Sequence, residues 1–324
     1  MNYLVSGGSG SLGTAIFQYF QKNPPDRVVC FSRDWQKQEK LRNTLKNPKW
    51  ARYIIGDVAD KERLSDALKN IDIVIHAGAI KDIVSSEYTP EEALKTNIYG
   101  TYNIVRAAIN NNVDKVLLIS TDKACNAINC YGKSKAMAES LAVGLNSHAR
   151  HTRTKISVCR YGNVVASSGS VVPLFQKQAK AGVLTLTDKR MTRFMVEMNT
   201  ATDFIFQCVK KMTGGEIFIP KLKSARIVDI AKAIAPDCEM REIGIRPGEK
   251  IHEMLITTQE ARHTKEYKDY YVIEPEHDFW SRPTVANRNM KEGWFYSSDR
   301  NDEWLSVDEI KGMVGESKGC KCDK

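Results

Sequence analysis

The stretch Lys115-Val116-Leu117-Leu118-Ile119-Ser120-Thr121-Asp122-Lys123-Ala124 decides which fold we expect for this chain. Residues 115–119 form a largely apolar run bounded by polar residues, which is typical of a buried strand in a parallel sheet. Thr121, Asp122 and Lys123 then lie at the carboxyl end of that strand, where open α/β sheets bind ligands. An acid beside a base at this point indicates acid–base chemistry. The alternative is a solvated ion pair at a strand end.

The next motif, Tyr131-Gly132-Lys133-Ser134-Lys135, stands at the start of a helix predicted to run to about residue 145. Tyr131 and Lys135 are four residues apart, so they share one helical face. The Lys135 ammonium is expected to stabilise the phenolate of Tyr131 and to lower the pKa of that phenol. Such a phenol can take a proton from a hydroxyl group while hydride leaves the same carbon. The spacing alone also fits two surface residues, but its position after the acid–base pair favours catalysis.

A glycine-rich loop between the first strand (residues 2–5) and an amphipathic helix (residues 14–21) predicts a cofactor site. Gly7, Gly10 and Gly13 supply the tight turn, the close approach of a pyrophosphate and the close packing of helix on strand. The helix N-terminus, with Ser11 and Leu12, then faces the phosphates. Because the pattern lies between a strand and a helix, it specifically indicates a dinucleotide.

The end of the second strand (residues 27–31) indicates which dinucleotide binds. An NAD site would place an acidic residue here for the ribose hydroxyls. This chain has Ser32 and Arg33 first, and Asp34 only afterwards. Because Arg33 can pair with a 2′-phosphate, we predict NADP.

The third and fourth strands add further cofactor contacts. The third strand (residues 53–58) carries Asp57 and Val58 at its end, and Asp57 is expected to face the adenine unless it only caps the next helix. Asn97 begins the long helix before residues 115–119, and since Asn is a poor helix former, a local hydrogen bond or a role in the site explains it. Small residues after the fourth strand let the cofactor lie close. The residues assigned to this turn and the loop beyond it are Ala77, Gly78, Ala79 and Lys81.

The order of elements predicts the fold class and a first domain. Strands and helices alternate from residue 1 through a sixth strand at 155–160. This alternation predicts an α/β fold with a Rossmann-like, doubly wound parallel sheet. We assign residues 1–161 to an NADP-binding domain.

After residue 161 the alternation weakens. We expect loops at 167–173 and 188–193, and a strand at 216–220 that returns to the large sheet. Residues 162–310 are assigned mainly to a smaller C-terminal substrate-binding region, and residues 311–324 to a tail.

Composition limits the kinds of partner. The chain has 324 residues, of which 42% are hydrophobic and 27% charged, as in ordinary globular proteins. Its net charge of +9 fits nucleic acid or a polyanionic small ligand. Because the cations form no block and no nucleic-acid motif occurs, we expect phosphorylated small ligands and no nucleic acid.

The same survey concerns compartment and metals. We find no run long enough to span a bilayer and no signal peptide, so we expect a soluble, cytoplasmic protein without membrane contact. Cys30, Cys159 and Cys208 lie in apolar runs and are expected to be core residues in a reducing compartment. Cys320 and Cys322 could bind a metal ion, but no third ligand is near in the sequence, so we expect a frayed tail and no metal site.

Together these motifs resemble the extended short-chain dehydrogenase/reductase superfamily. Within it the chain is similar to the soluble, inverting UDP-N-acetylglucosamine 4,6-dehydratases that begin pseudaminic acid synthesis. The resemblance runs from the first strand to about residue 310. Besides the glycine loop and the Tyr131–Lys135 pair, it is carried by His76-Ala77-Gly78-Ala79-Ile80-Lys81, Thr121-Asp122-Lys123-Ala124, Arg160-Tyr161-Gly162-Asn163-Val164-Val165, Met191-Thr192-Arg193-Phe194, Gly244-Ile245-Arg246-Pro247-Gly248-Glu249-Lys250 and Trp304-Leu305-Ser306-Val307.

The resemblance implies a tightly held NADP, UDP-N-acetylglucosamine as substrate, and a homo-oligomer. Tyr131, assisted by Lys135, would take the O4 proton, and Thr121 would hydrogen-bond O4. Lys123 would be the base at C5, kept neutral by burial and nearby positive charge, and Asp122 the acid for the departing 6-hydroxyl. The residues nominated for the substrate are Lys81, Thr121, Tyr131, Asn163, Val172, Arg246 braced by Glu249, and, as a second choice for its phosphates, Arg193.

The sequence departs from the family pattern at two places and leaves alternatives open. The family more often has Ala at position 78 and Pro at position 127, where this chain has Gly78 and Ala127. The membrane-bound, retaining relatives carry transmembrane helices before this domain. Because we find none in this sequence, we expect the inverting branch. One alternative is a UDP-sugar 4-epimerase, which needs the Tyr and the Lys but no acid–base pair, so Asp122 and Lys123 speak against it. A reductase would use free NADPH, whereas a tightly held cofactor is expected here. A third alternative is an NADP-sensing regulatory protein, but such proteins usually lack the Tyr or the Lys, and this chain has both.

Overall fold

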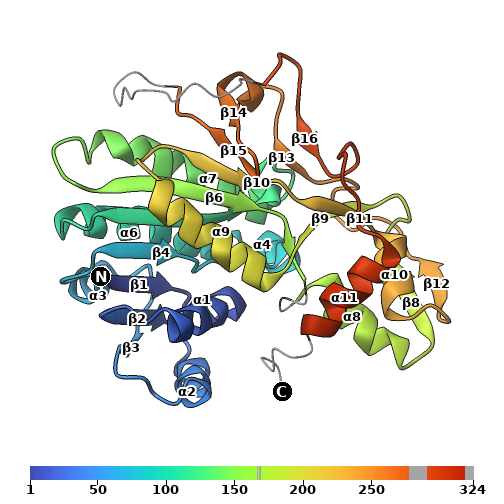
Figure 1. Cartoon of the computed structure of the whole chain (residues 1–324), viewed down its shortest axis with the longest axis horizontal. Helices are drawn as coiled ribbons and strands as arrows, with labels where there is room; N and C mark the ends of the chain where they lie inside the picture. Colours follow the sequence, from blue (N-terminus) through green and yellow to red (C-terminus); the bar gives the residue numbers. More distant parts are fainter. Residues whose placement is uncertain (166, 168, 277–289, 318–324) are drawn as a thin grey trace.

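The computed structural model describes residues 1–165, 167, 169–276 and 290–317, and one large sheet dominates it (Figure 1). Within these residues the sheet has nine strands in the order β14-β15-β10-β6-β5-β4-β1-β2-β3. Neighbours from β10 to β3 are parallel, and β15 and β14 continue antiparallel at one edge. This arrangement confirms the predicted Rossmann-like sheet. The strands are β1 (Asn2–Ser6), β2 (Arg27–Ser32), β3 (Ala51–Ile55), β4 (Ile73–His76), β5 (Lys115–Thr121), β6 (Lys155–Tyr161), β10 (Ile217–Pro220), β14 (Thr264–Glu266) and β15 (Tyr270–Ile273).

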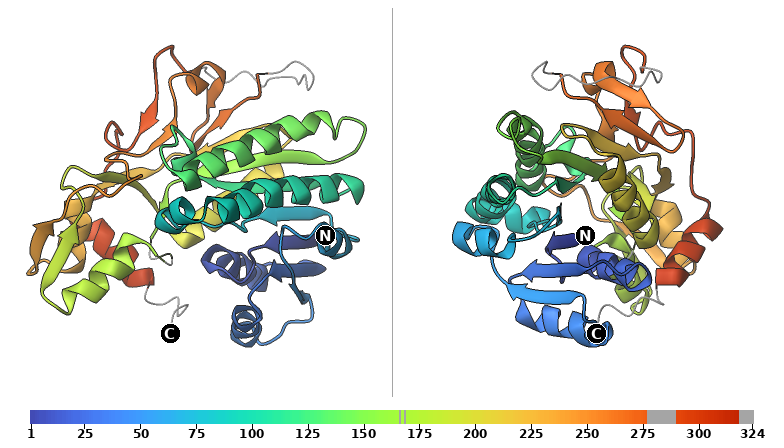
Figure 2. Two further views of the ribbon diagram at one scale, coloured as in Figure 1. Left: turned by 180° about the vertical axis from the view of Figure 1, so that it is seen from behind. Right: turned by 60° about the vertical axis from the view of Figure 1, so that its left-hand side comes forward.

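Helices cover both faces of this sheet, as Figure 2 shows from behind. Successive residues of a strand face opposite sides, so each strand serves two cores. In β1, Leu4 packs with residues of α3, α6 and α7 on one face, and Val5 packs with residues of α1, α2 and α9 on the other. The helices are α1 (Ser11–Lys22), α2 (Trp35–Thr44), α3 (Lys61–Ala67), α6 (Gly100–Asn110), α7 (Cys130–Gly144) and α9 (Met198–Lys211), with the short α4 (Ile83–Tyr88) and α5 (Pro90–Ala93) before α6.

A smaller unit with its own core lies beyond one end of the sheet (Figure 1). Its core joins Phe175 of α8, Ile230 of α10 and Val314 of α11. Its elements are β7 (Asn163–Val164), α8 (Val171–Ala179), β8 (Val183–Leu186), β9 (Thr192–Val196), β11 (Lys223–Arg226), α10 (Ile227–Ile234), β12 (Glu239–Glu242) and α11 (Val307–Ser317). A two-stranded pair, β13 (Met254–Ile256) and β16 (Tyr296–Ser297), completes the C-terminal half.

The structure differs from the sequence expectations at several element ends. Residues 171–173 already belong to α8, and residues 192–193 already belong to β9, so both expected loops are shorter. Residues 311–317 continue helix α11 and do not form a tail. The third strand ends at Ile55, two residues before Asp57.

Asn97 lies inside a π-helical turn, η1 (Leu94–Tyr99), and not at the start of α6. Its buried side chain bonds the backbone of Ile80 in both directions, at 2.8 and 2.9 Å, and the hydroxyl of Ser134 at 2.9 Å. The wider turn therefore accompanies an Asn that ties the loop after β4 to α7.

Within the part of the chain that the structure describes, no helix is long and apolar enough to cross a bilayer. Among the same residues, no three His, Cys, Asp or Glu side chains gather as metal ligands would. Cys320 and Cys322 lie outside the described residues.

Candidate active site

A cavity of about 780 Å³ opens at the carboxyl ends of the parallel strands, between the sheet and the smaller unit. It collects residues that the sequence placed far apart. From the predicted cofactor site it is lined by Gly7, Gly10, Ser11, Leu12, Gly13, Ser32, Arg33, Asp57, Val58, Ala77, Gly78, Ala79, Lys81, Tyr131 and Lys135. From the predicted catalytic and substrate residues it adds Thr121, Lys123, Asn163, Arg246 and Glu249.

The glycine loop forms the floor of this cavity. Gly7 has a φ of +67°, and its amide donates to the carbonyl of Phe31 at 2.8 Å. A Cβ on Gly7 would lie 2.8 Å from the Cα of Gly78, so the turns after β1 and β4 touch backbone to backbone. Helix α1 begins at Ser11 and presents its N-terminus here. Backbone amides and a helix N-terminus therefore surround a space that a side chain in place of the glycines would fill. This arrangement fits the pyrophosphate of a dinucleotide.

Arg33 and Asp34, the two charged residues after β2, make different contacts, and this bears on which of them can reach the cofactor ribose. The carboxylate of Asp34 caps α2, where it accepts from the amide of Lys37 at 3.0 Å. The guanidinium of Arg33 is more than half exposed and lies 3.6 Å from the carboxylate of Asp57. Asp57 in turn accepts from the amide of Ala59 at 2.9 Å, whereas Asp60 caps α3. A cation therefore lies on the cavity wall at the position from which the sequence predicts contact with a 2′-phosphate.

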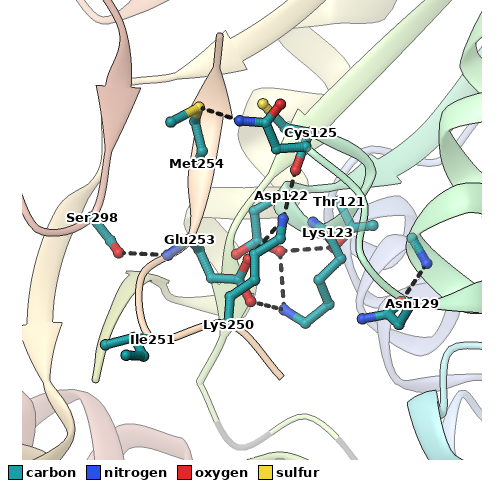
Figure 3. A network of polar contacts seen from close by, with 12 residues as sticks. Thr121, Asp122, Lys123, Cys125, Asn129, Lys250, Ile251, Glu253, Met254 and Ser298 are labelled. Carbon is teal, nitrogen blue, oxygen red and sulfur yellow. Dashed lines mark hydrogen bonds and ion pairs between the residues drawn. The ribbon is translucent and has the colours of Figure 1, made fainter. Parts of the chain in front are cut away.

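The acid–base pair lies where β5 ends and the short 3-10 turn η2 (Asp122–Ala124) begins (Figure 3). The Nζ of Lys123 is 3.0 Å from Oδ1 of Asp122, and the hydroxyl of Thr121 donates to the same oxygen at 2.9 Å. Asp122 is fully buried, and among the described residues its Oδ2 has no hydrogen-bond partner. Burial raises the pKa of Asp122, although Lys123 opposes this. An easily protonated carboxyl next to an amine is a pair that can supply and remove protons.

Glu253 is a member of this group that the sequence reasoning missed. Its carboxylate is buried and lies 3.3 Å from Nζ of Lys123 and 3.6 Å from Nζ of Lys250. Burial lowers the pKa of Lys123, but Asp122 and Glu253 outweigh burial and the net shift is upward. The expectation that Lys123 is held neutral was therefore wrong, because two carboxylates face it. A signal existed in the spacing Lys250-Ile251-His252-Glu253, but it does not reveal contact with residue 123.

The Tyr131–Lys135 pair also differs from expectation. Burial raises the pKa of Tyr131 to about 12, and Lys123 and Thr121 only reduce that rise. The groups that lower it are Lys123 and Thr121, whereas the Nζ of Lys135 donates to the carbonyl of Ile119 at 2.7 Å. Burial lowers the pKa of Lys135 itself to about 8. Both side chains line the cavity, so the predicted position is retained but the predicted shift of the phenol is not.

The turn at 244–250 from the C-terminal half closes onto the start of α7. Asn129 caps α7 by accepting from the amide of Gly132, and its amide nitrogen donates to the carbonyl of Gly248, both at 2.7 Å. Lys250 donates to the carbonyl of Cys125 at 2.6 Å. The guanidinium of Arg246 lies 3.9 Å from Glu249, as the bracing role predicted, and remains partly exposed in the cavity.

Three residues that the sequence nominated for ligand binding instead make contacts within the protein. The guanidinium of Arg193 donates to the carbonyls of Thr192, Lys250 and Ile251, at 2.7–3.0 Å, and lies off the cavity lining. Val172 is buried in the core of the smaller unit. Asn97 is buried behind the cavity wall. By contrast, Asn163 lines the cavity, and its buried Oδ1 has no hydrogen-bond partner among the residues that the structure describes.

Comparisons with known proteins agree with this site. A family model described as "Polysaccharide biosynthesis protein" matches residues 3–275. The sheet, the glycine loop and the Tyr131–Lys135 pair define a short-chain dehydrogenase/reductase. The chain belongs to the polysaccharide biosynthesis protein family within that superfamily, which confirms the resemblance noted from its motifs.

Individual relatives agree over nearly the whole chain. An inverting UDP-N-acetylglucosamine 4,6-dehydratase of Campylobacter jejuni is 41% identical, over 98% of this chain and 98% of its own. A UDP-glucose 4-epimerase of Rickettsia conorii is 40% identical over 83% of this chain and 82% of its own. The X-ray structure of Pen from Bacillus thuringiensis matches with a TM-score of 0.91 and 34% identity, over 98% of both chains.

Proposed function

We propose that this protein catalyses NADP-dependent 4,6-dehydration of UDP-N-acetylglucosamine with inversion at C5. The product would be a UDP-4-keto-6-deoxy-L-arabino-hexosamine for the synthesis of pseudaminic acid or a related glycan. The observation that carries the proposal is the ion pair between Asp122 and Lys123. Lys123 lines the cavity together with Tyr131, whereas Asp122 is buried behind it. A sequence identity of 41% to an inverting dehydratase over nearly the whole chain supports it. Homo-oligomerisation and a cytoplasmic location stay predictions from the sequence.

The residues that would hold NADP surround the glycine cradle. Gly7, Gly10 and the N-terminus of α1 would bind the pyrophosphate, and Arg33 would bind the 2′-phosphate. When bound, NADP supplies a hydride acceptor for C4 and the hydride that returns to C6. Lys135 and Tyr131 lie on the cavity wall at the end of β5 and would orient the reacting sugar.

The side chains of this protein would handle the protons. Tyr131 would remove the proton of O4, with Thr121 bonded to O4. Lys123 would take the proton of C5 once the 4-ketone acidifies it, and Asp122 would protonate the departing 6-hydroxyl. In the resting ion pair Lys123 is protonated and Asp122 is ionised, whereas the base must be neutral and the acid must carry a proton. A shift of one proton along the 3.0 Å bond from Nζ of Lys123 to Oδ1 of Asp122 would make both competent at once.

The substrate would enter from the side of the smaller unit. Arg246, braced by Glu249, would bind the diphosphate, because a guanidinium matches phosphate oxygens. Asn163, which lines the cavity, would hydrogen-bond the sugar or the uridine. Lys81 lines the same cavity and is assigned to both ligands.

A second candidate function is UDP-sugar 4-epimerisation, because relatives 40% identical to this chain are named UDP-glucose 4-epimerases. Epimerisation needs the Tyr131–Lys135 pair but not an acid and a base at C5 and C6. The buried Asp122–Lys123 pair is therefore the feature that favours dehydration.

The decisive experiment is a proton NMR time course in D₂O with purified protein, NADP and UDP-N-acetylglucosamine. A new C6 methyl signal with deuterium at C5 is expected, and the ring couplings report whether C5 inverts. Formation of the galacto-configured sugar alone would establish the epimerase. No change in the spectrum with UDP-N-acetylglucosamine, and none with UDP-glucose in a parallel sample, would refute both and favour the NADP-sensing regulatory protein.

A further inference from the structure

We propose that Glu253 is a positioning residue of the acid–base site, which shares the ammonium group of Lys123 with Asp122 and thereby fixes the place and the charge of Lys123. This inference rests on the proposed dehydration for its catalytic meaning. The contact between the two side chains stands independently of the reaction.

The first support is the way Glu253 is held. Its amide donates to the hydroxyl of Ser298 at 2.9 Å, and the amide of Ser298 donates back to the Glu253 carbonyl at 2.8 Å. Both residues are buried, and Ser298 follows β16, the partner strand of β13. A backbone fixed from both directions aims the carboxylate across to η2, as Figure 3 shows. The C-terminal half thus contributes directly to a site built on the large sheet.

The second support is the set of charges around this carboxylate. Lys123 approaches it from η2 at 3.3 Å and Lys250 from the preceding turn at 3.6 Å. Arg193 of β9 adds positive charge, and Asp122 adds the nearby negative charge. Burial raises the pKa of Glu253, but the three cations outweigh burial and lower it. Glu253 therefore stays ionised. Within the described part of the chain, its Oε2 makes the 3.6 Å ion pair with Lys250 and no hydrogen bond.

Two further titratable groups complete the surroundings. The imidazole of His252, next in the chain, is turned to the hydroxyl of Thr192 at 2.9 Å. Tyr131 on α7 is affected by Glu253, whose charge raises the pKa of the phenol. One carboxylate thus raises the pKa of Asp122, Lys123 and Tyr131 together.

This common direction gives the proposal a specific consequence. Removing the charge of Glu253 makes Lys123 lose its proton more easily and also makes Asp122 lose its proton more easily. The limb of the pH–rate profile that reports the base and the limb that reports the acid then both move to lower pH. A loss of mere packing would lower the rate without moving either limb.

The test compares Glu253→Gln with wild type in two measurements. In the pH dependence of kcat for UDP-N-acetylglucosamine, both limbs are expected to move down by roughly one pH unit. In labelling of the substrate-free protein by trinitrobenzenesulfonate at pH 9, read by peptide mass spectrometry, Lys123 is expected to react about tenfold faster. Lys81, which lines the same cavity, serves as the internal reference.

Two further variants keep the test decisive. Glu260→Gln is the matched control, because Glu260 pairs with Arg160 at 2.8 Å and not with Lys123; it should lower stability and leave both measurements unshifted. Glu253→Asp keeps the negative charge but places it farther from Lys123, because the side chain is one methylene shorter. It should therefore give shifts of the same sign and smaller size, and it can be measured even if Glu253→Gln does not fold.

Unchanged labelling of Lys123 in both Glu253 variants overturns the proposal. If wild type turns over no nucleotide-sugar, the proposed function fails, whereas the labelling still decides the role of Glu253. A slower enzyme with an unshifted profile and unshifted labelling would mean that Glu253 is only structural.

Discussion

Gly132 packs its Cα directly onto the main chain of Lys123, and a Cβ at position 132 would overlap the Lys123 carbonyl oxygen. Helix α7 therefore rests on the 3-10 turn η2 at the residue after Tyr131. This contact sets the spacing between the phenol of Tyr131 and the ammonium of Lys123. The glycine inside the Tyr-x-x-x-Lys motif is thus a positioning element.

Replacing Gly132 with Ala should push α7 away from η2. We expect a loss of about 1–3 kcal/mol in unfolding free energy. A displacement of the catalytic groups by about 1 Å should lower kcat about 100-fold. Gly144→Ala is the control, because Gly144 ends the same helix with open space around it, and it should be neutral or slightly stabilising. Thermal unfolding and kcat for both variants check this, and an active, stable Gly132→Ala protein would contradict it.

Lys123→Ala should separate proton transfer at C5 from cofactor binding. If Lys123 is the base, deuterium exchange at C5 in D₂O should fall by about 10²- to 10⁴-fold. The affinity for NADP should be unchanged. Lys133→Ala removes an exposed lysine of α7 and should keep the wild-type exchange rate. Exchange at the wild-type rate in Lys123→Ala would assign the base elsewhere.

Arg33→Ala should weaken NADP and leave NAD nearly unaffected. Loss of a charge-assisted contact with the 2′-phosphate should lower the affinity for NADP by about 10- to 100-fold. Arg52→Ala is the matched control, since Arg52 of β3 donates to the carbonyls of Lys49 and Ala51. Isothermal titration with both dinucleotides measures the effect. Equal affinity of wild type for NAD and NADP would argue against the prediction.

Local patterns allowed much of the fold to be predicted. The apolar run at 115–119 is β5, and the glycine loop lies between β1 and α1, as expected. The four-residue spacing placed Tyr131 and Lys135 on one face because helical geometry is local. Element ends were less predictable: Asp57 lies beyond β3, because the strand stops where its pairing with β2 stops.

Long-range contacts were beyond such reasoning. Glu253 is 130 positions from Lys123, and only the folded chain brings the two together. For the same reason the charge of Lys123 was mispredicted, since its pKa depends on the carboxylate of Glu253 from the C-terminal half. Arg193 and Val172 have residue types suited to a ligand site. In the folded chain, however, Arg193 donates to backbone carbonyls and Val172 packs in the core of the smaller unit.

His76, at the end of β4, is buried, and each of its ring nitrogens lies within hydrogen-bond distance of a hydroxyl group. Its Nδ1 lies 2.5 Å from the hydroxyl of Ser6, and its Nε2 lies 3.1 Å from the hydroxyl of Thr101. The Thr101 hydroxyl donates to the carbonyl of Asn97 and so accepts from Nε2. Since a neutral imidazole that carries its N–H on Nε2 has an acceptor at Nδ1, the Ser6 hydroxyl donates to Nδ1 while it accepts from the amide of Gly78. Protonation of Nδ1 would break the hydrogen bond from Ser6, which lies at the end of β1 and also contacts the turn after β4.

This arrangement predicts a loss of stability in acid. Burial, with a smaller contribution from Lys135, lowers the pKa of His76 from 6.5 to about 3. Between these values the unfolded chain binds a proton that the native protein does not, so the unfolding free energy falls as pH falls, by about 1.4 kcal/mol per pH unit. His76→Gln should remove this part of the slope, and exposed His151→Gln should retain it. Urea unfolding at pH 6.5 and 4.5 measures the difference. Equal slopes in wild type and His76→Gln would mean that His76 titrates normally in the native protein.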